Sequence, residues 1–559
     1  MKSDGLRLFE RIIELIWFSL LGVALVAVVL TTERQARQVE ENPSYCDPFG
    51  YLQMAQDIRQ AAAAGRVPQF SIESPHSRLL IECMQSQKVP LPLWDEMVAP
   101  LAYHYFPAAD HLAVQYPPGA GLMLAVFPEG KALHGMNRLV IVIFLVSGLV
   151  MLVVAAVKRR PLAAGFFMLA LSLGLEILAQ LFNASFSINA LLAPLLLSGL
   201  CLSGAWAWRD GKDRYSYPAW FLVLLAGLFF GFAVLARLPV ILLLPGVLLL
   251  IWPRRLRTLP KSALVPFILG VFLGGLLPLM VHQSRVAGAW YRTTYGQSDL
   301  TPPTAERVLA NAAYFFGAGK SSTINWVLPV ILIGCVGLLL WSTRKTAAER
   351  SETIMPRLSW GRLLTAAALI LLISNAYFLT HFPAGHYYPW PAVFGAVLLV
   401  SLGTFALEEH PLARIGGRGW PGRTLLVLGL ILSSLPGLVF IWRAGFRYTS
   451  HGPERGPKTF ALPAELADER AWVWACELSG TLWYYARKPA HKVTSTNPDT
   501  RELVFKFVQG RGEPQYIVTD DSSMQSVADE IVQSGAKLER RGEVDGIPYF
   551  LIHWPPEKP

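Results

Sequence analysis

Eleven stretches of about 20 mostly apolar residues run through the sequence, and this pattern limits what the chain can fold into. In lipid every backbone polar group needs an internal partner, so such stretches predict membrane-spanning helices. Charged residues make up 16% of the chain, against about 25% in an ordinary soluble protein, which argues against a soluble enzyme. The predicted spans lie near residues 12–30, 137–157, 162–181, 187–208, 218–236, 238–252, 262–281, 325–342, 362–380, 389–407 and 424–442.

The charged residues are distributed unevenly, which divides the chain into two domains. Residues 453–559 hold 29 of the 88 charged residues, so this segment has the composition of a soluble domain. Three short apolar runs in it predict strands, and a helix is predicted between Asp521 and Gly535. The predicted fold class is a polytopic α-helical membrane protein, residues 1–452, followed by a C-terminal α/β domain. The predicted strands are 471–475, 515–519 and 547–553.

Lys and Arg residues in the short loops predict the orientation of the spans. With the N-terminus in the cytoplasm, the cytoplasmic segments hold 21 basic residues and the opposite short loops hold five. This asymmetry predicts that the N-terminus lies inside and the C-terminal domain outside. The basic residues form short runs between apolar stretches, which is typical of topology-setting loops and not of a nucleic-acid-binding face.

Two loops on the outer side are too long to be simple connections, residues 31–115 and residues 282–324. The first of them contains a predicted helix, which Asp47 begins as N-cap and Gly65 ends. The apolar residues of this helix predict that it lies along the membrane surface.

The five cysteines lack the CxxC spacing of a zinc ribbon. Cys201 and Cys335 lie in apolar runs and are interpreted as small core residues. Cys46 and Cys83 share the first long loop, and in an oxidising compartment we expect a disulfide between them.

Asp47 has two interpretations. Its carboxylate could be a general base that accepts a proton from an alcohol acceptor, or it could only cap its helix. Tyr51, four residues later, is expected on the same helix face. Asp95 and Glu96 form a second acidic pair, which could supply the base or be solvated loop acids.

Several motifs, in their order along the chain, resemble those of integral-membrane glycosyltransferases of the GT-C fold, such as lipid A aminoarabinose transferases and protein O-mannosyltransferases. Asp47-Pro48-Phe49-Gly50-Tyr51 resembles an acidic motif at the start of the first outer helix, with Pro48 where the family has Glu. The other motifs are Tyr116-Pro117-Pro118-Gly119, the Gly-rich segment 227–245, the Gly- and Tyr-bearing segment 287–296, and the segment 475–488, which contains SGTLWYYARK at residues 479–488. The resemblance covers nearly the whole chain.

This resemblance implies transfer of a sugar from a polyprenyl-phosphate carrier to a lipid, glycan or protein acceptor on the outer face, by one inverting displacement. Asp47 would be the base, with Tyr51 beside it. Glu176, an acid inside the third predicted span, is a candidate second acid, or a residue that only pairs with a polar neighbour.

The phosphate of such a donor needs cations, because negative charge builds on it as the sugar leaves. Arg237 is the first candidate, since an unpaired Arg at a membrane-depth turn would be costly. Its alternative role is a snorkelling anchor. The candidate substrate-binding residues are Arg237, Arg285, Arg292, Lys320, His386 and Tyr387, of which the aromatic residues could instead belong to an interfacial belt.

Two other classes of protein remain open, a transporter or lipid flippase, and a catalytically silent member of the same fold. Paired interrupted helices and buried charges in several spans would favour a transporter. No cofactor follows from the sequence, and no metal site is assigned, because His104, Asp110 and His111 lack metal-site spacing. A need for a divalent metal is left open.

Overall fold

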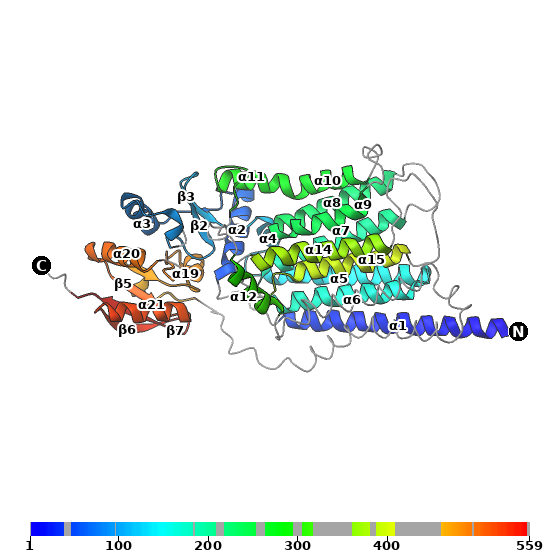
Figure 1. Cartoon of the computed structure of the whole chain (residues 1–559). Coiled ribbons are helices and arrows are strands. Elements are labelled where there is room, and N and C mark those ends of the chain that lie inside the picture. Colours follow the sequence, from blue (N-terminus) through cyan, green and yellow to red (C-terminus); the bar gives the residue numbers. More distant parts are fainter. Residues whose placement is uncertain are drawn as a thin grey trace.

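The computed structural model describes residues 2–37, 46–94, 97–182, 185–207, 217–252, 263–294, 304–316, 360–380, 387–407, 460–494 and 497–555. Long helices form a bundle, and a head of two small sheets and short helices, built from residues 46–114 and 460–555, lies at one end of it (Figure 1). The predicted class, a helical membrane protein with a C-terminal α/β region, is confirmed. The bundle contains α1 (Lys2–Ala36), α4 (Gly119–Ala125), α5 (Ala132–Val157), α6 (Pro161–Gln180), α7 (Phe186–Ala207), α8 (Tyr217–Ala236), α9 (Leu244–Ile251), α10 (Leu264–Val271), α11 (Leu277–Val286), α14 (Trp360–Thr380) and α15 (Trp390–Leu407).

Seven helices among the described residues are long and apolar enough to cross a membrane. They are Glu14–Ala36, Ala132–Val157, Ala163–Gln180, Phe186–Trp206, Pro218–Ala236, Leu264–Val286 and Gly361–Thr380. Leu238–Ile251 and Trp390–Phe405 are shorter apolar segments at two further predicted spans. The predicted spans 325–342 and 424–442, and the predicted domain boundary at 452/453, lie outside the described residues.

Helix α8 packs closely on α10, because glycines remove side chains from the contact. A Cβ atom on Gly227 would lie 2.2 Å from the backbone oxygen of Phe267, and one on Gly231 would lie 2.6 Å from that of Val271. Small residues at a four-residue spacing are the usual way in which membrane helices approach closely. The π-helical turn η4 (Phe272–Leu276) between α10 and α11 lies at this contact.

The predicted turn after the fifth span is confirmed. Helix α8 ends at Ala236, and Arg237 has an extended backbone (φ −153°, ψ 109°) before the 3₁₀ helix η2 (Leu238–Leu243). Pro239 cannot donate a backbone hydrogen bond, so it favours a new helix start over continuation of α8.

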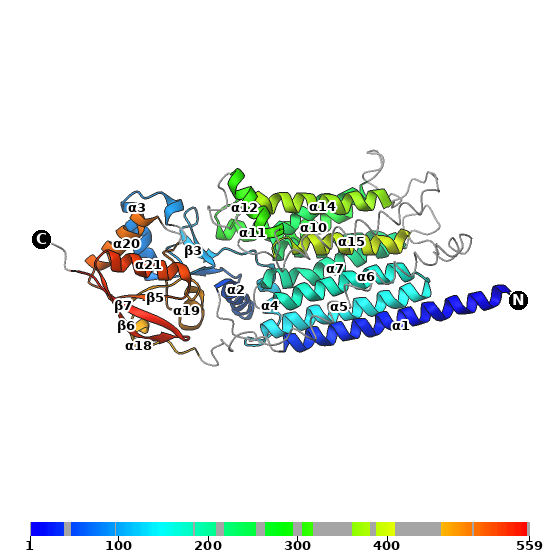
Figure 2. The same ribbon diagram turned by 60° about the horizontal axis from the view of Figure 1, so that its bottom comes forward.

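Helix α2 (Cys46–Ala63) begins one residue before Asp47, which therefore lies in the first turn instead of preceding it. Gly65, at φ +62°, ends the helical segment as predicted. The expectation that α2 lies along a membrane surface is not supported, because Leu52 and Ala55 are buried against protein. In two views α2 lies between the bundle and the rest of the head (Figures 1 and 2).

The remainder of the first loop forms a small antiparallel sheet that the sequence analysis missed. Its strand order is β1-β3-β2. The elements are β1 (Ser71–Ile72), α3 (Pro75–Ser86), the 3₁₀ helix η1 (Leu91–Leu93), β2 (Tyr103–Phe106) and β3 (His111–Val114). Further along the chain, α12 (Ala305–Phe316) belongs to the second long loop and contacts α14.

The expected disulfide between Cys46 and Cys83 is wrong, because Cys83 is a free thiol. Cys83 belongs to the apolar face of α3, where it is buried together with Leu80 and Met84. This face packs α3 onto the core of the head, so the thiol is used as a small apolar group.

The C-terminal region is an α/β unit with strand order β4-β5-β7-β6, in which β4 and β5 are parallel and the other neighbours antiparallel. The three predicted strands and the helix after Asp521 are confirmed, and the Asp521 side chain accepts the Met524 backbone N–H at 2.7 Å. The elements are α18 (Ala464–Ala467), β4 (Trp472–Trp474), α19 (Ser479–Ala486), α20 (Pro498–Gly510), β5 (Gln515–Val518), α21 (Ser522–Gln533), β6 (Lys537–Val544) and β7 (Ile547–His553).

Candidate functional site

The short helix α4 connects two of the motifs that carry the resemblance to glycosyltransferases, Tyr116-Pro117-Pro118-Gly119 and the Gly-rich segment 227–245. It begins directly after Pro117-Pro118, and its first residue, Gly119, lies against the end of α8. A Cβ atom on Gly119 would lie 2.4 Å from the backbone nitrogen of Ala236. The contact therefore requires glycine, and it fixes the backbone immediately before Arg237.

We expect Gly119→Ala to lower the thermal stability of the purified protein. No flexible side chain can yield at this contact, so the backbone of α4 or α8 must shift, at a cost of about 1–3 kcal/mol. Gly361→Ala is the matched control, because nothing lies within 4 Å of its Cβ position and alanine favours helix. Equal melting temperatures for the two variants would contradict this packing.

Helix α4 also contacts α2, which carries Asp47 at its start. The Arg59 guanidinium of α2 donates to the backbone oxygen of Phe127 at 2.7 Å, just past the end of α4. Nearer the start of α2, the Tyr51 ring stacks on Tyr116, with 4.4 Å between centroids, and its centroid lies 6.5 Å from that of Phe186. The face of α2 that bears Tyr51 is therefore turned toward the first residue of α7.

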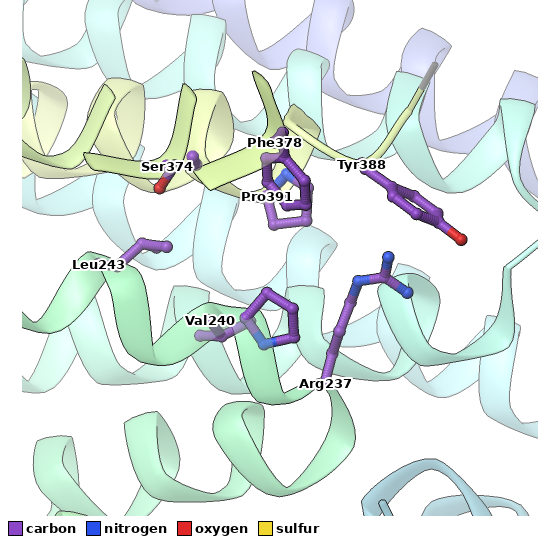
Figure 3. A pocket seen from close by; sticks show the side chains of 9 residues that line it. Arg237, Val240, Leu243, Ser374, Phe378, Tyr388 and Pro391 are labelled. Atoms are coloured by element: carbon purple, nitrogen blue, oxygen red, sulfur yellow. The ribbon is translucent and has the colours of Figure 1, made fainter. Parts of the chain in front are cut away.

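Arg237 lies on the other side of the α7 start. Its Nη1 donates to Ser187 Oγ at 2.9 Å, and its Cζ lies 4.6 Å from the centroid of the Tyr388 ring. Figure 3 shows the guanidinium directed toward Tyr388 beside a pocket lined mostly by apolar residues. The pocket is lined by Arg237, Pro239, Val240, Leu243, Ser374, Phe378, Tyr388, Pro391 and Ala392.

Because Phe186 and Ser187 are consecutive, they connect the Tyr51 face of α2 to the Arg237 guanidinium. The position of Asp47, one turn before Tyr51, falls on the same face of α2. Of the predicted residues, Tyr51 and Arg237 are thus brought to one place at the head end of the bundle. Nothing is described of the Asp47 side chain itself, which lies outside the described set.

Of the other predicted residues, four have described positions, which are in α6, at and just after the end of α11, and shortly before α15. Glu176 accepts a hydrogen bond from the Gln180 amide, one turn before the end of α6. Arg285 and Arg292 are exposed at the end of α11 and just after it. Tyr387 contacts Trp390, with 6.3 Å between ring centroids. Lys320, His386, Asp95 and Glu96 lie outside the described residues.

The sequence analysis missed two partners of Arg237. Ser187 was not singled out, although a serine in the first turn of a predicted span is a natural hydrogen-bond acceptor. Tyr388, which follows the candidate Tyr387, was not named as a site residue, and the structure places its ring against the guanidinium. An arginine at a break between two predicted spans could have indicated that such partners exist.

One group of residues in the described part of the chain has the composition of a metal site. Ligand atoms of Cys476, Glu477 and Asp521 lie within 4.8 Å of one another beyond the ends of β4 and β5. Burial raises the pKa of the Cys476 thiol to about 12, so a metal would have to displace a firmly held proton. His104 and Asp110, to which no metal site was assigned, have other partners: His104 hydrogen-bonds to Gln115, and Asp110 pairs with Arg78.

Two buried histidines lie where the first loop meets the C-terminal region. The His76 ring stacks on Trp472, with centroids 4.3 Å apart, and lies 6.4 Å from the His491 ring. Burial and the nearby Lys488 lower the pKa of His76 to about 4, although Glu513 opposes this. Burial and His76 lower the pKa of His491 to about 3. Both rings are therefore neutral at pH 7.

We expect the free energy of unfolding to fall as the pH drops from about 6.5 to about 4. In the unfolded chain both histidines have pKa values near 6.5, so below that pH the unfolded state binds more protons. The contribution of His76 is roughly 1–3 kcal/mol, fully present above pH 6.5. Melting temperatures between pH 7.5 and 4.5 measure it.

The variant His76→Phe keeps a ring against Trp472 and should flatten this pH dependence. His553→Gln is the control, because His553 is exposed and pairs with Glu539, a residue of the edge strand β6. If His76→Phe retained the full slope of the native protein, the buried histidine would not be its source.

Solved structures of two other proteins are similar to this chain at low sequence identity. No family model and no curated protein matches the chain. Among solved structures, ArnT from Cupriavidus metallidurans in the apo state has a TM-score of 0.45 and 12% identity, covering 99% of this chain and 98% of that one. The same protein bound to undecaprenyl phosphate has a TM-score of 0.44 and 13% identity, with 96% and 97% covered. The apo oligosaccharyltransferase of Archaeoglobus fulgidus has a TM-score of 0.43 and 10% identity, with 89% and 69% covered. Both are GT-C membrane proteins, the class that the sequence resembles.

Proposed function

We propose that the protein is an integral-membrane glycosyltransferase of the GT-C class. It would move a sugar from a polyprenyl-phosphate carrier to a lipid, glycan or protein acceptor at the head end of the bundle. The observation that carries this proposal is the junction at Phe186 and Ser187, where the Tyr51 face of α2 and the Arg237 guanidinium meet. Such a transfer requires a carboxylate that can accept a proton and a cation that can neutralise the phosphate, and the start of α2 and Arg237 would supply them at one place.

The proposed reaction is a single displacement with inversion. The Asp47 carboxylate takes the proton of an acceptor hydroxyl, whose oxygen then bonds to the anomeric carbon of the sugar. The bond from that carbon to the phosphate oxygen breaks, and polyprenyl phosphate leaves as an anion that needs no proton. Arg237 neutralises the charge that builds on this phosphate.

Further roles follow from the same proposal for the remaining predicted residues. Glu176 would be a second acid near the reacting sugar, with Tyr51 lining the acceptor side. The sites for the carrier phosphate and sugar would be completed by Arg285, Arg292, Lys320, His386 and Tyr387. The Arg237 pocket holds about 10 Å³, room for about one water molecule, so a phosphate reaching the guanidinium would have to displace Tyr388.

The proposed location is a bacterial inner membrane, with the N-terminus in the cytoplasm and residues 453–559 forming an external domain. The start of α1 and the C-terminal sheet lie at opposite ends of the bundle, which supports this orientation (Figure 1). A reporter that is active only in the cytoplasm, fused after Pro559, should stay silent. A bright fusion would put the head on the cytoplasmic side and contradict the orientation.

The function is tested by titrating the purified protein with undecaprenyl phosphate, the lipid bound in one of the ArnT crystal structures. A ligand at 100 times its Kd stabilises the native state by about 2.7 kcal/mol, which raises the melting temperature. Phosphatidylglycerol, an anionic lipid without a polyprenyl chain, is the control. We expect stabilisation by undecaprenyl phosphate alone, followed by sugar transfer when a charged carrier is supplied. Movement of the lipid across vesicles without transfer would instead favour a flippase.

A further inference from the structure

Helix α19 of the C-terminal region contacts the first three turns of α2, which lie more than 400 residues earlier in the chain. Phe49, two residues after Asp47, is fully buried. Its ring centroid lies 5.3 Å from that of Tyr484 and 5.5 Å from that of Tyr485. The Tyr485 ring in turn stacks on Phe460 at 5.5 Å, so the contact continues into the C-terminal region.

Arg487 makes the second contact between these helices. Its guanidinium donates from Nη1 to Gln53 Oε1 and from Nη2 to Gln56 Oε1, the latter at 2.9 Å. The Gln53 side-chain amide in turn donates to Asp57 Oδ1 at 2.7 Å, so Gln53 links Arg487 to Asp57. The ring and guanidinium contacts together involve Phe49, Gln53 and Gln56, which lie along one side of α2.

The backbone of Arg487 is in the left-handed region, at φ +52°, where it ends α19. A residue with a Cβ atom costs about 1–2 kcal/mol more than glycine in this backbone conformation. Glycine would be the better residue for the helix end alone. The contacts of the Arg487 guanidinium with α2 therefore offset the backbone cost of having arginine at this position.

Helix geometry relates this contact to the opposite side of α2. Residues two apart on an α-helix lie about 200° around its axis, so the positions of Asp47 and Phe49 fall on nearly opposite faces. Clamping Phe49 into the C-terminal region turns the Asp47–Tyr51 face toward Tyr116 and Phe186. The far end of α19 is also fixed, since the backbone N–H of Leu101 donates to Ser479 Oγ at 2.9 Å.

We infer that Tyr484, Tyr485 and Arg487 are positioning residues, through which the C-terminal region sets the place and rotation of the Asp47-bearing turn of α2. This inference rests on the proposed function for its effect on transfer, and its structural part stands without it. The C-terminal region would then help to position the residues of the transfer site, and it would not be a functionally separate domain.

The test uses the full-length variant Arg487→Gly, which removes the guanidinium and at the same time relieves the left-handed backbone. Folding of the C-terminal region should therefore be preserved. Lys88→Gly is the matched control, a cationic residue of the head at φ +53° that also gives way to glycine. A second variant, Tyr484→Leu with Tyr485→Leu, removes both rings, and Tyr484→Phe with Tyr485→Phe restores them.

Amide hydrogen exchange is the first measurement, because it needs no substrate. We expect exchange in residues 46–63 to rise about tenfold in Arg487→Gly and in the double Leu variant, with residues 522–533 unchanged. Turnover of the sugar transfer is the second measurement. In Arg487→Gly and in the double Leu variant we expect kcat to be about tenfold lower than in the native protein, and KM for the lipid donor to stay within about twofold of the native value. The double Phe variant should recover the native kcat.

Unchanged exchange in α2 would overturn the inference. So would faster exchange in α2 with normal kcat, because α19 would then only pack against α2 without positioning it. If the native protein transfers no sugar from any polyprenyl-phosphate donor, the proposed function fails, and the exchange measurement still decides whether α19 holds α2.

Discussion

Asp47→Asn is expected to lower sugar transfer by about 100-fold or more, with expression and fold intact. Asparagine has nearly the same size and shape as aspartate, so the change removes the proton acceptor and costs the first turn of α2 only about 0.3–1 kcal/mol of charge–dipole stabilisation. If Asp47 only stabilised the start of α2, the Asn variant would keep its activity, and Asp47→Ala would cost a similar amount of stability. The measurement is transfer from lipid carrier to acceptor by membranes that hold matched amounts of each variant.

The Ala and Asn variants should fail alike, because neither can accept a proton. Near-normal turnover by Asp47→Asn would refute the role of base, and Asp95, Glu96 or Glu176 would have to be tested instead. Normal exchange of residues 46–63 in the Asn variant would show that lost activity comes from the missing carboxylate and not from a displaced helix.

Arg237→Ala should give the second large loss, roughly 10- to 100-fold in kcat/KM for the polyprenyl-phosphate donor. The variant removes the cation at the α8 break and leaves Ser187 and Tyr388 in place. Arg237→Lys should recover only part of the activity, because an ammonium group keeps the charge without the planar, two-pronged donor set. Donor binding and transfer rates should be measured on the same preparations.

Arg138→Ala is the control for charge at the same end of the bundle. Arg138 pairs with Glu33 at 3.1 Å and is half exposed, and such pairs contribute about 0–1 kcal/mol. A donor affinity unchanged in Arg237→Ala would place the phosphate elsewhere. Arg285 and Arg292 would then be the next cations to test.

The sequence predicted elements that one physical signal defines. Apolar stretches of membrane-spanning length located the long helices, and the break at Arg237 followed from a proline after an arginine between two such stretches. In the C-terminal region, apolar strands and a capping Asp521 were enough for three strands and one helix. These signals are local, so each could be recognised without knowing the fold.

Elements that depend on tertiary contacts were missed. Strand β6 has the sequence KLERRGEV, and it is an edge strand whose side chains are mostly exposed, so it lacks an apolar run. Cys83 was expected to pair with another cysteine, because sequence position gives no distance between two thiols. The role of Gly119 became clear only when α8 was placed against it.

The same distinction applies to the candidate site. Tyr51 and Arg237 were predicted one by one, and their connection through Phe186 and Ser187 depends on how α7 packs between α2 and α8. The contact of Tyr484 and Arg487 with α2 joins residues more than 400 positions apart. No local pattern in the sequence indicates such a contact.

The most direct test of the central claim is an experimental structure of the full-length protein with undecaprenyl phosphate. We predict its phosphate within hydrogen-bond distance of the Arg237 guanidinium, with Tyr388 displaced and the start of α2 facing the phosphate. Density for the phosphate at the opposite end of the bundle, or at the head with Arg237 still against Tyr388, would contradict the account.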